Sequence, residues 1–473
     1  MRGRSLRAAL PILVSLAATR LPGASEQFPR GEIVPRVVCS GNGQQSYALY
    51  LPAASASGKP LPILYVLDPR KRGVLAAERF QEAAERYGYI LASSNNTMSD
   101  GPLAPTLEAI RAIWTDTHER FAIDPQRVYL VGFSGTARAA CLLAGTSGGQ
   151  IAGVIGCGAG FPDATTAKKD LPFLFFGAVG NTDFNYREMR DLDRTLAGLG
   201  VTRRLAVFDG PHGWPPVPVC TRAVEWMELR TMQKGARPRD DAFASRVLER
   251  EMADAAAREA AGKLGEALDR YREIAADFDG LADVSPARAA GDRLASDPRS
   301  AKQKKQQESL EQREDVQRAE LAAKLMEDLR SDDPLPPLRV SADLKLTALK
   351  RRAESDPDEA QRLSAKRLLA ALSVQTSFYL PREYLEHRDA RRARLCAAVA
   401  AEISPERAGL VWYNFACLQA QAGDKKSAVA TLREAVEKGF HDANLMESDP
   451  DLDALRDDAG YRKILEGLKG AAR

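Results

Sequence analysis

Residues 129–142 read YLVGFSGTARAACL, and this stretch decides the fold. An apolar run ends at Gly132, the letters FSGT follow, and small residues at helical spacing come directly after them. This change of pattern predicts a strand that turns sharply into a helix, with Ser134 in the turn. In such a turn the hydroxyl stands clear of the sheet, where an acyl group could reach it. The usual pattern has a second glycine at the position of Thr136, and threonine there would crowd the contact between helix and strand.

Strand and helix patterns alternate through residues 32–233 and predict an α/β domain over residues 26–234. Short apolar runs bounded by turn residues predict the strands. The runs are almost continuously apolar, which indicates a mostly parallel sheet with helices on both faces. We expect strands at 37–39, 46–51, 61–67, 89–94, 128–132, 151–157, 172–177 and 204–208, and helices at 76–87, 107–121, 137–143 and 221–232.

A base and an acid for Ser134 are predicted from the order of residues along the chain. A serine hydroxyl attacks well only when a neighbouring base removes its proton. Of the four histidines, only His212 lies downstream of Ser134 within the α/β domain, in a loop rich in Gly and Pro after a strand. Asp183 follows the preceding strand, where a carboxylate can orient the imidazole and stabilise its charged form.

Each of these residues also has an ordinary explanation. A loop histidine is usually a polar surface residue, and Asp183 could simply cap the helix after it. Asp209 is a rival acid, but it is so close to His212 in the sequence that we expect it to shape the turn. Three residues in the required order, each after a strand, favour a triad of Ser134, Asp183 and His212.

Preorganised N–H groups are needed to hold the oxyanion of an acyl intermediate. Gly135 N–H, directly after the serine, is the first candidate, and a second N–H should come from the loop after the strand at 61–67. Residues 68–73 read DPRKRG, which makes Arg70 or its neighbour the second candidate. The basic side chains of this loop would either attract an anionic substrate or simply face solvent.

The stretches VYLVGFSGTARAA, FGAVGNTDFNYREM and FDGPHGW resemble the α/β-hydrolase superfamily. Within it they are similar to compact esterases related to polyhydroxybutyrate depolymerases, feruloyl esterases and dienelactone-hydrolase-like proteins. The resemblance implies that Ser134 is the nucleophile, Asp183 the acid and His212 the base. It covers less than half of the chain. This sequence departs from the family pattern in two places. Thr136 stands at the final glycine position, and LDPRKRG stands where relatives often carry His-Gly.

Acyl transfer from an ester to water is the reaction that we expect, with no metal or cofactor. Phe133, beside the serine, and Trp214, two residues after the histidine, are candidates for contact with the substrate. The same triad would also serve a peptidase. A catalytically inactive α/β region in an exported repeat protein is the alternative, which Thr136 and the long helical half of the chain motivate.

The composition changes after Met232. A polar stretch with Pro and Gly predicts a linker at 235–244, and residues 245–473 are rich in Ala, Leu, Glu, Arg and Lys at helical spacing. Residues 406–440 resemble the tetratricopeptide helix-turn-helix unit well, and residues 246–278 resemble it fairly. The resemblance implies an all-α repeat domain that offers a surface to a protein partner.

The N-terminus predicts export. MRGRSLR carries three arginines, the apolar run AALPILVSLAA follows, and small residues precede an expected cleavage after Ser25. An uncleaved anchor is the alternative, although the run is short for a membrane span. We therefore expect a signal peptide over residues 1–25, a periplasmic or secreted protein, and no stable membrane insertion after cleavage.

The remaining composition is that of an ordinary soluble protein. Hydrophobic residues make up 44% of the 473 residues and charged residues 28%. A net charge of +3 gives no reason to expect nucleic acid as a partner. Six cysteines do not form a disulfide framework, and no group of them has zinc-site spacing. The sequence leaves open whether Cys39 and Cys220 pair in an oxidising compartment.

Overall fold

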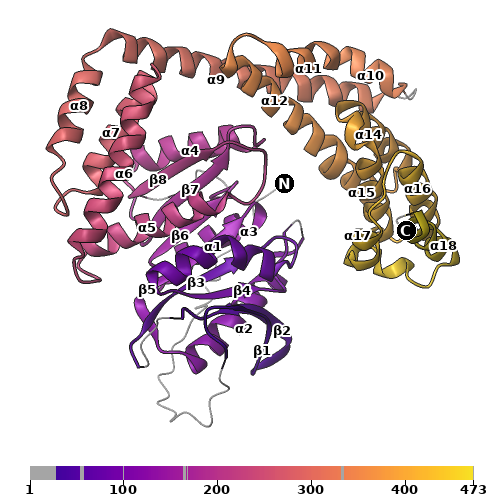
Figure 1. Cartoon of the computed structure of the whole chain (residues 1–473). Helices are drawn as coiled ribbons and strands as arrows, with labels where there is room; N and C mark the ends of the chain where they lie inside the picture. Colours follow the sequence, from indigo (N-terminus) through magenta and orange to yellow (C-terminus); the bar gives the residue numbers. More distant parts are fainter. Residues whose placement is uncertain are drawn as a thin grey trace, which may run out of the picture. The chain divides into compact units, whose positions relative to one another are not determined.

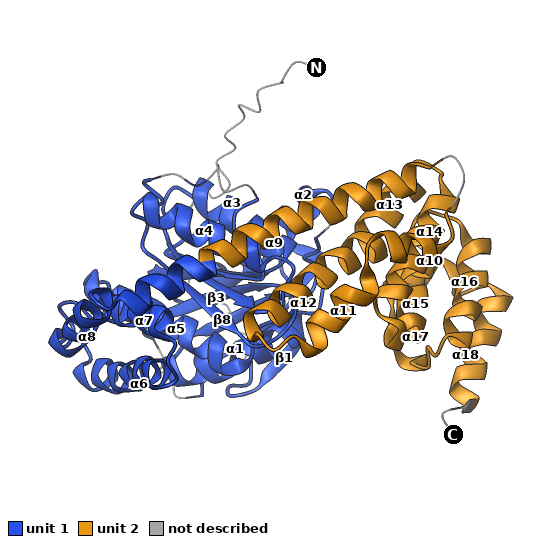
Figure 2. Cartoon of the chain, turned by 90° about the horizontal axis from the view of Figure 1, so that it is seen from above, with its two compact units in different colours: residues 1–307 blue, residues 308–473 orange. Residues whose placement is uncertain are grey.

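The computed structural model describes residues 28–53, 58–99, 101–162, 167, 169–331 and 335–471. The predicted signal peptide lies outside these residues. The chain divides into two compact units, residues 1–307 and residues 308–473, which are coloured separately in Figure 2. The boundary falls inside one long helix, α9 (Pro298–Arg330), so residues of α9 contribute to both units.

Unit 1 is built on one sheet of eight strands in the order β1-β2-β4-β3-β5-β6-β7-β8. β2 runs antiparallel to its neighbours β1 and β4, and all other neighbouring pairs are parallel. This is the arrangement of the α/β-hydrolase fold that the sequence predicts. The strands are β1 (Ile33–Cys39), β2 (Asn42–Tyr50), β3 (Leu61–Leu67), β4 (Ile90–Ser94), β5 (Ile123–Phe133), β6 (Gly153–Cys157), β7 (Leu174–Gly180) and β8 (Arg203–Phe208).

Helices cover both faces of the sheet (Figure 1). α1 and α5 pack on one face, around Phe80 and Trp226, while α2, α3 and α4 pack on the other, around Leu192. Successive strand residues alternate between the two cores, as Tyr65 and Val66 do, because side chains of a strand point to opposite faces. The helices are α1 (Gly73–Tyr87), α2 (Leu103–Arg120), α3 (Gly135–Thr146), α4 (Tyr186–Gly198) and α5 (Val217–Gln233).

The strand order reverses between β3 and β5. The chain leaves β3 toward β4 on one side and returns to β5 on the other side. At such a reversal a crevice opens beyond the carboxyl ends of the parallel strands. Leu67 at the end of β3 is paired with Gly132 near the end of β5. The loop that begins at Asp68 therefore lies beside the turn that holds Ser134.

All six cysteines are buried and free. Cys39 packs in the core on one face of the sheet and Cys220 in the core on the opposite face. The pairing that the sequence left open is therefore not present. Burial raises the pKa of the Cys39 thiol and that of the Cys220 thiol to about 12, so both thiols stay uncharged at neutral pH.

The predicted linker at 235–244 does not separate the two units. Helix α6 (Asp241–Ala260) begins inside it, and the Asp240 side chain accepts from Phe243 N–H to cap that helix. Two further helices follow, α7 (Leu264–Asp277) and α8 (Ser285–Ala295). Together with α6 they share one apolar core with the end of α5. Leu229 of α5 and Ile274 of α7 both lie in this core. These three helices belong to unit 1 because they bury apolar side chains against its last sheet-covering helix.

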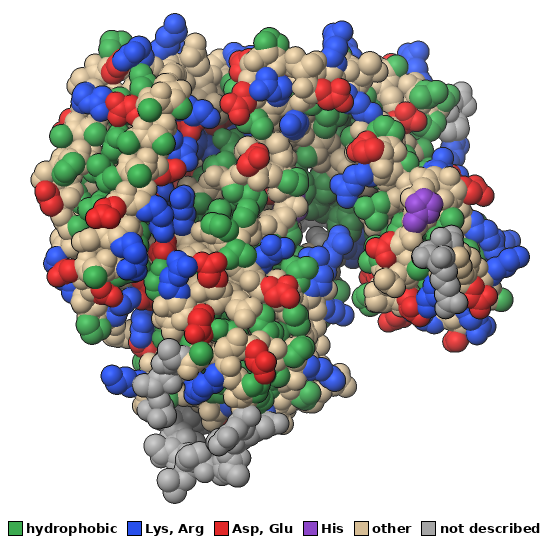
Figure 3. Space-filling view, in the orientation of Figure 1, with side chains coloured by type: hydrophobic (Ala, Val, Ile, Leu, Met, Phe, Trp, Pro, Cys, Tyr) green, Lys and Arg blue, Asp and Glu red, His purple; other side chains and the backbone are tan. Residues whose placement is uncertain are grey.

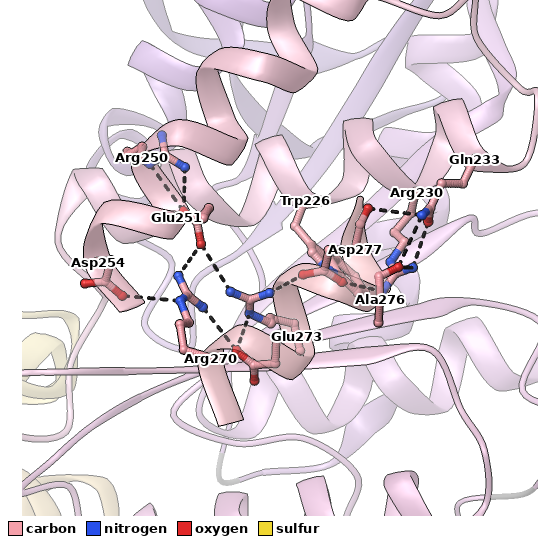
Figure 4. Close-up of polar contacts among 11 residues, drawn as sticks. Trp226, Arg230, Gln233, Arg250, Glu251, Asp254, Arg270, Glu273, Ala276 and Asp277 are labelled. Carbon is pink, nitrogen blue, oxygen red and sulfur yellow. Dashed lines mark hydrogen bonds and ion pairs between the residues drawn. The ribbon is translucent and has the colours of Figure 1, made fainter. Parts of the chain in front are cut away.

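A buried ionic cluster completes the attachment of these helices (Figure 4). Arg204 of β8 is 7% exposed and contacts Glu251 at 3.2 Å and Glu273 at 3.3 Å, and it also pairs with Asp277. Trp226 Nε1 donates to Asp277 at 3.0 Å. Burial alone would lower the pKa of Arg204, but the carboxylates of Glu273, Asp277 and Glu251 more than reverse this and raise it. The charges thus compensate one another's desolvation.

All regular elements among the described residues of unit 2 are helices. Unit 2 buries two apolar cores, one built mainly from α9 to α14 and one mainly from α14 to α18. Arg367 donates to Glu314 of α9 at 2.9 and 2.6 Å, and both side chains are buried. This part of the charge-rich α9 is therefore packed rather than solvated. The further helices are α10 (Pro337–Asp343), α11 (Leu346–Ser355), α12 (Glu359–Val374), α13 (Leu380–Glu386), α14 (Ala390–Ile403), α15 (Ala408–Gln421), α16 (Lys425–Glu437), α17 (Ala443–Ser448) and α18 (Ala459–Ala471).

Two helix pairs occupy the stretches that resemble tetratricopeptide units. α6 and α7 are joined by a turn with Gly262 at φ +75°, and α15 and α16 by a turn with Gly423 at φ +84°. Glycine adopts this left-handed conformation without a steric penalty. Ala416 and Ala428 are fully buried where α15 and α16 pack. The assignment of these pairs to that repeat family stays a prediction.

The described helices include none that is both long and apolar enough to cross a membrane. On the face drawn in Figure 3, basic and acidic side chains are interspersed and do not gather by sign.

Candidate functional site

Ser134 occupies a strained turn between β5 and α3. Its φ of 54° and ψ of −125° are rare for a residue other than glycine, which costs about 1–3 kcal/mol. The Ser134 N–H donates to Cys157 O at 2.8 Å and so holds the turn against β6. A Cβ on residue 132 would lie 2.5 Å from Thr136 O, so the close approach of helix and strand requires Gly132.

Thr136 does not crowd this turn, contrary to the expectation from the sequence. Its side chain is fully buried, and its Oγ1 lies 2.5 Å from Leu67 O and 2.8 Å from Phe133 O. The same oxygen accepts from Phe133 N–H at 3.1 Å. The threonine hydroxyl therefore binds the turn to the end of β3. The close approach of α3 to the end of β5 excludes a side chain at position 132, but it leaves room for one at position 136.

The structure brings Ser134, His212 and Asp183 into one chain of hydrogen bonds. Ser134 Oγ lies 3.0 Å from His212 Nε2, and His212 Nδ1 lies 2.8 and 2.9 Å from the two carboxylate oxygens of Asp183. With its hydrogen on Nδ1, the ring donates to Asp183 and accepts from the serine hydroxyl. Asp183 is fully buried, whereas the His212 side chain remains 18% exposed. This geometry can move a proton from serine to imidazole.

The loops after β7 and β8 hold the acid and the base together. A Cβ on Gly180 would lie 2.2 Å from Gly210 O, so these loops can approach only with glycine at position 180. Asn181 bridges them, since its amide donates to Asp209 Oδ1 at 3.0 Å and accepts from Gly210 N–H at 3.1 Å. Asp209 is an exposed part of this loop contact, and the carboxylate that contacts His212 is that of Asp183.

Aromatic rings fix the plane of the imidazole. The ring of Phe133 lies 4.7 Å and that of Phe184 4.2 Å from the His212 ring, measured between centroids. Phe133 is buried and belongs to the apolar core on the α1 and α5 face of the sheet. Trp214 packs against Phe133 at 5.4 Å and donates its indole N–H to Asp68 Oδ2 at 2.9 Å. Phe184 directly follows the predicted acid, yet no local pattern in the sequence pointed to its contact with the histidine.

Asp68 is the centre of the loop after β3. It is fully buried and accepts from Arg70 N–H at 2.8 Å, from Arg72 N–H at 3.2 Å and from Trp214 Nε1. The Arg72 guanidinium also pairs with it at 3.0 Å. Asp68 therefore ties the loop after β3 to the loop that carries His212, a role that its place in LDPRKRG did not reveal.

The prediction of Arg70 as an oxyanion donor does not fit this geometry. Its N–H is bound to Asp68, and Lys71 N–H donates to Thr97 O at 3.1 Å. Pro69 has no N–H, and Arg72 N–H is also bound to Asp68. No backbone N–H of residues 69–72 is left to meet a ligand, because the short side chain of Asp68 captures two of them.

The amino end of α3 does offer a backbone donor. Among the described residues no acceptor contacts Gly135 N–H, which is the first N–H of the helix. A Cβ on residue 135 would lie 2.4 Å from Ser99 Cβ and 3.1 Å from its Oγ, so Ser99 packs directly over Gly135. No sequence signal pointed to Ser99, since only the tertiary structure brings it to this peptide.

One group of side chains in the described part of the chain is close enough to share a metal ion: Cys417, Asp449 and Asp451 in unit 2. Asp449 is already engaged, since it accepts from Tyr413 Oη at 2.8 Å and from Asp451 N–H at 3.0 Å. Burial raises the pKa of the Cys417 thiol well above its usual value, which opposes the thiolate form that binds metals. The local hydrogen bonds account for this group.

Comparisons with known proteins give short or distant matches. A family model described as "A/B hydrolase-like, N-terminal domain" matches residues 382–470, which lie in unit 2. A chloroplastic protein of Arabidopsis thaliana is 29% identical over 73 residues, or 15% of this chain. The chain thus spans about a fifth of that relative, 22% of its length.

Three solved structures match part of this chain at low similarity. The fluorophosphonate-binding serine hydrolase FphF of Staphylococcus aureus is 15% identical, with a TM-score of 0.34 over 39% of this chain and 92% of that one. A ferulic acid esterase is 15% identical, with a TM-score of 0.36 over 41% and 96%. Dienelactone hydrolase of Anabaena variabilis is 18% identical, with a TM-score of 0.32 over 42% and 97%. Values this low carry no activity over to the present chain.

Proposed function

We propose that this protein is a serine hydrolase that transfers the acyl group of a carboxylic ester to water. The observation that carries the proposal is the hydrogen-bonded chain from Ser134 Oγ through His212 to the buried carboxylate of Asp183. The strained backbone of Ser134 supports it further, because strain of this kind persists where function requires it.

In this mechanism His212 Nε2 takes the Ser134 proton while the serine oxygen attacks the ester carbonyl. The oxyanion forms beside Gly135 N–H, where the amino end of α3 adds favourable potential. His212 then gives the proton to the leaving alcohol, and an acyl-serine remains. A water molecule, deprotonated by the same imidazole, releases the acid and restores Ser134. Asp183 keeps the imidazole in the required tautomer and stabilises its cation.

The helical parts of the chain support a second role, the binding of a protein partner. The pair α15 and α16 has the small buried residues and the glycine turn of a repeat unit, and such units commonly present binding surfaces. With the predicted signal peptide, the proposal describes an exported esterase that carries a helical interaction region. A peptidase remains the alternative reaction for the same three side chains.

The proposal is tested by labelling the purified protein with a fluorophosphonate probe and by measuring turnover of p-nitrophenyl acetate. Wild type should label and turn over, and Ser134→Ala should abolish labelling and lower kcat by about 10⁴-fold or more. His212→Ala should have a similar effect on turnover. His118→Ala is the matched control, because His118 packs against Trp114 in the same unit and should leave activity unchanged.

Well-folded wild type that neither labels nor turns over would refute the enzyme and leave the helical repeats as the functional part. Cleavage of p-nitroanilides at rates above those of matched esters would favour the peptidase.

A further inference from the structure

We propose that Asn185, the residue that precedes α4, is a positioning residue for the catalytic triad proposed above. It acts by binding residues 157–158, the segment at the end of β6. The proposal rests on the serine hydrolase activity of the preceding section. In it Asn185 does not touch the ester, but it fixes the backbone that supports the reacting side chains.

The segment at 157–158 supports both the serine and the histidine. Cys157 O accepts from Ser134 N–H at 2.8 Å and so holds the strained turn. Gly158 is buried and lies against the imidazole, since a Cβ on residue 158 would lie 3.0 Å from His212 Cε1 and 3.2 Å from its Nδ1. A displacement of this short segment would therefore disturb the turn at Ser134 and the position of the ring together.

Asn185 binds this segment to the acid. Its backbone N–H donates to Asp183 Oδ1 at 2.7 Å, and its side-chain amide donates to Gly158 O at 2.8 Å. The same carboxylate oxygen of Asp183 lies 2.9 Å from His212 Nδ1. Because Gly158 is buried, its carbonyl oxygen requires a donor, and loss of the amide would favour movement of the segment toward another one. One residue thus connects the acid with the support of the base.

The side chain of Asn185 is not used to cap its helix. Asn185 is the N-cap residue of α4, yet its side chain makes no capping hydrogen bond. Asparagine and aspartate at this position usually accept from an N–H of the first turn, as Asp240 does at the start of α6. Departure from such a local rule is expected where a side chain serves a site. A substitution at Asn185 also removes no cap, so α4 should form as it does in wild type.

The experiment compares wild type, Asn185→Leu and Asn185→Gln in the turnover of p-nitrophenyl acetate and in the rate of labelling by a fluorophosphonate. Asn185→Leu is close to asparagine in size but has no donor. It should lower kcat about 10- to 100-fold and leave KM within about threefold, because a misplaced base slows proton transfer and not binding of the ester. The labelling rate should fall in parallel, since it depends on the same imidazole. Asn185→Gln keeps an amide donor and should recover most of kcat.

Asn42→Leu is the matched control. The Asn42 amide donates to Glu108 at 3.0 Å elsewhere in unit 1, so this variant also loses an amide hydrogen bond and should keep the wild-type kcat. Gly158→Ala tests the segment itself, because its methyl group would press on His212 Cε1 and should lower kcat without a change in KM. Thermal midpoints show whether each variant is folded at the assay temperature.

Active wild type with the kcat of Asn185→Leu within about threefold of it would overturn the proposal and leave the hydrolase intact. A lower thermal midpoint in Asn185→Leu, with unchanged kcat and labelling rate, would overturn it in favour of a structural role. A wild-type kcat in Gly158→Ala would overturn the assignment of the segment as the support of the ring. Wild type that neither labels with fluorophosphonate nor turns over would overturn both proposals together.

Discussion

Two polar clusters lie within unit 1, and both join residues that are far apart in the sequence. One links Ser134, His212 and Asp183 at the carboxyl ends of the strands. The other gathers carboxylates of α6 and α7, which Figure 4 labels as Glu251, Glu273 and Asp277, and these pair with Arg204 of β8. Both contain fully or almost fully buried charged groups, so burial alone does not identify a functional site.

The difference between the clusters lies in what remains available to a ligand. Around Arg204 the carboxylates of Glu251 and Asp277 each meet more than one cation, and the backbone there is ordinary strand and helix. At Ser134 the backbone is strained, the histidine is partly exposed, and Gly135 N–H has no acceptor among the described residues. The Arg204 cluster satisfies its charged groups, whereas the proposed site at Ser134 keeps one hydroxyl and one backbone donor in reserve.

The largest expected effect is on the first cluster. Asp183→Asn should lower kcat toward p-nitrophenyl acetate by about 10⁴-fold, because the amide no longer favours the imidazole tautomer that accepts the serine proton. The thermal midpoint should change little. Asp209→Asn is the matched control and should keep kcat within about threefold of wild type. A larger loss in Asp209→Asn than in Asp183→Asn would show that the wrong acid has been assigned.

The second cluster should respond in stability and not in catalysis. Arg204→Met leaves Glu251 and Asp277 with fewer cations in a site that excludes water, and it should lower the free energy of unfolding by about 3 kcal/mol. Arg203→Met is the control, since its pair with Asp193 is partly exposed and should contribute under about 1 kcal/mol. Urea unfolding followed by circular dichroism measures both.

A loss of kcat in Arg204→Met, with an unfolding free energy equal to that of wild type, would show that the Arg204 cluster is not purely structural.

A smaller change in the free energy of unfolding is expected from Thr136→Val. This variant tests whether the Thr136 hydroxyl stabilises the turn at Ser134. The substitution keeps the shape of the side chain but removes the hydroxyl that accepts from Phe133 N–H, so it should cost about 1–3 kcal/mol of stability. Thr146→Val, at the exposed end of the same helix, should cost less than about 0.5 kcal/mol. Equal unfolding free energies for the two variants would mean that the threonine hydroxyl does not support the turn.

The sequence predicted the sheet and the sharp turn at Ser134 because both depend on local patterns. Apolar runs define strands, and the change to small residues after Gly132 defines the turn. The order serine, acid, histidine then selected Asp183 and His212 from a short list of candidates. The linker at 235–244 and the Arg70 donor were wrong for a shared reason. In both places side chains make contacts that local composition does not encode: α6 to α8 pack on α5, and Asp68 captures the Arg70 N–H.

The sequence by itself determined the fold class of unit 1 and the position of Ser134 in a tight turn, and it predicted Asp183 and His212, which the structure joins to it in one chain of hydrogen bonds. Periodicity and turn chemistry are local properties, so they can be read along the chain. Only the tertiary structure decided that Asp68 closes its own loop, that Ser99 lies over Gly135, and that Arg204 joins three elements. These outcomes depend on which loops meet at the reversal between β3 and β5 and on which charges are buried together. Long-range packing alone determines such contacts.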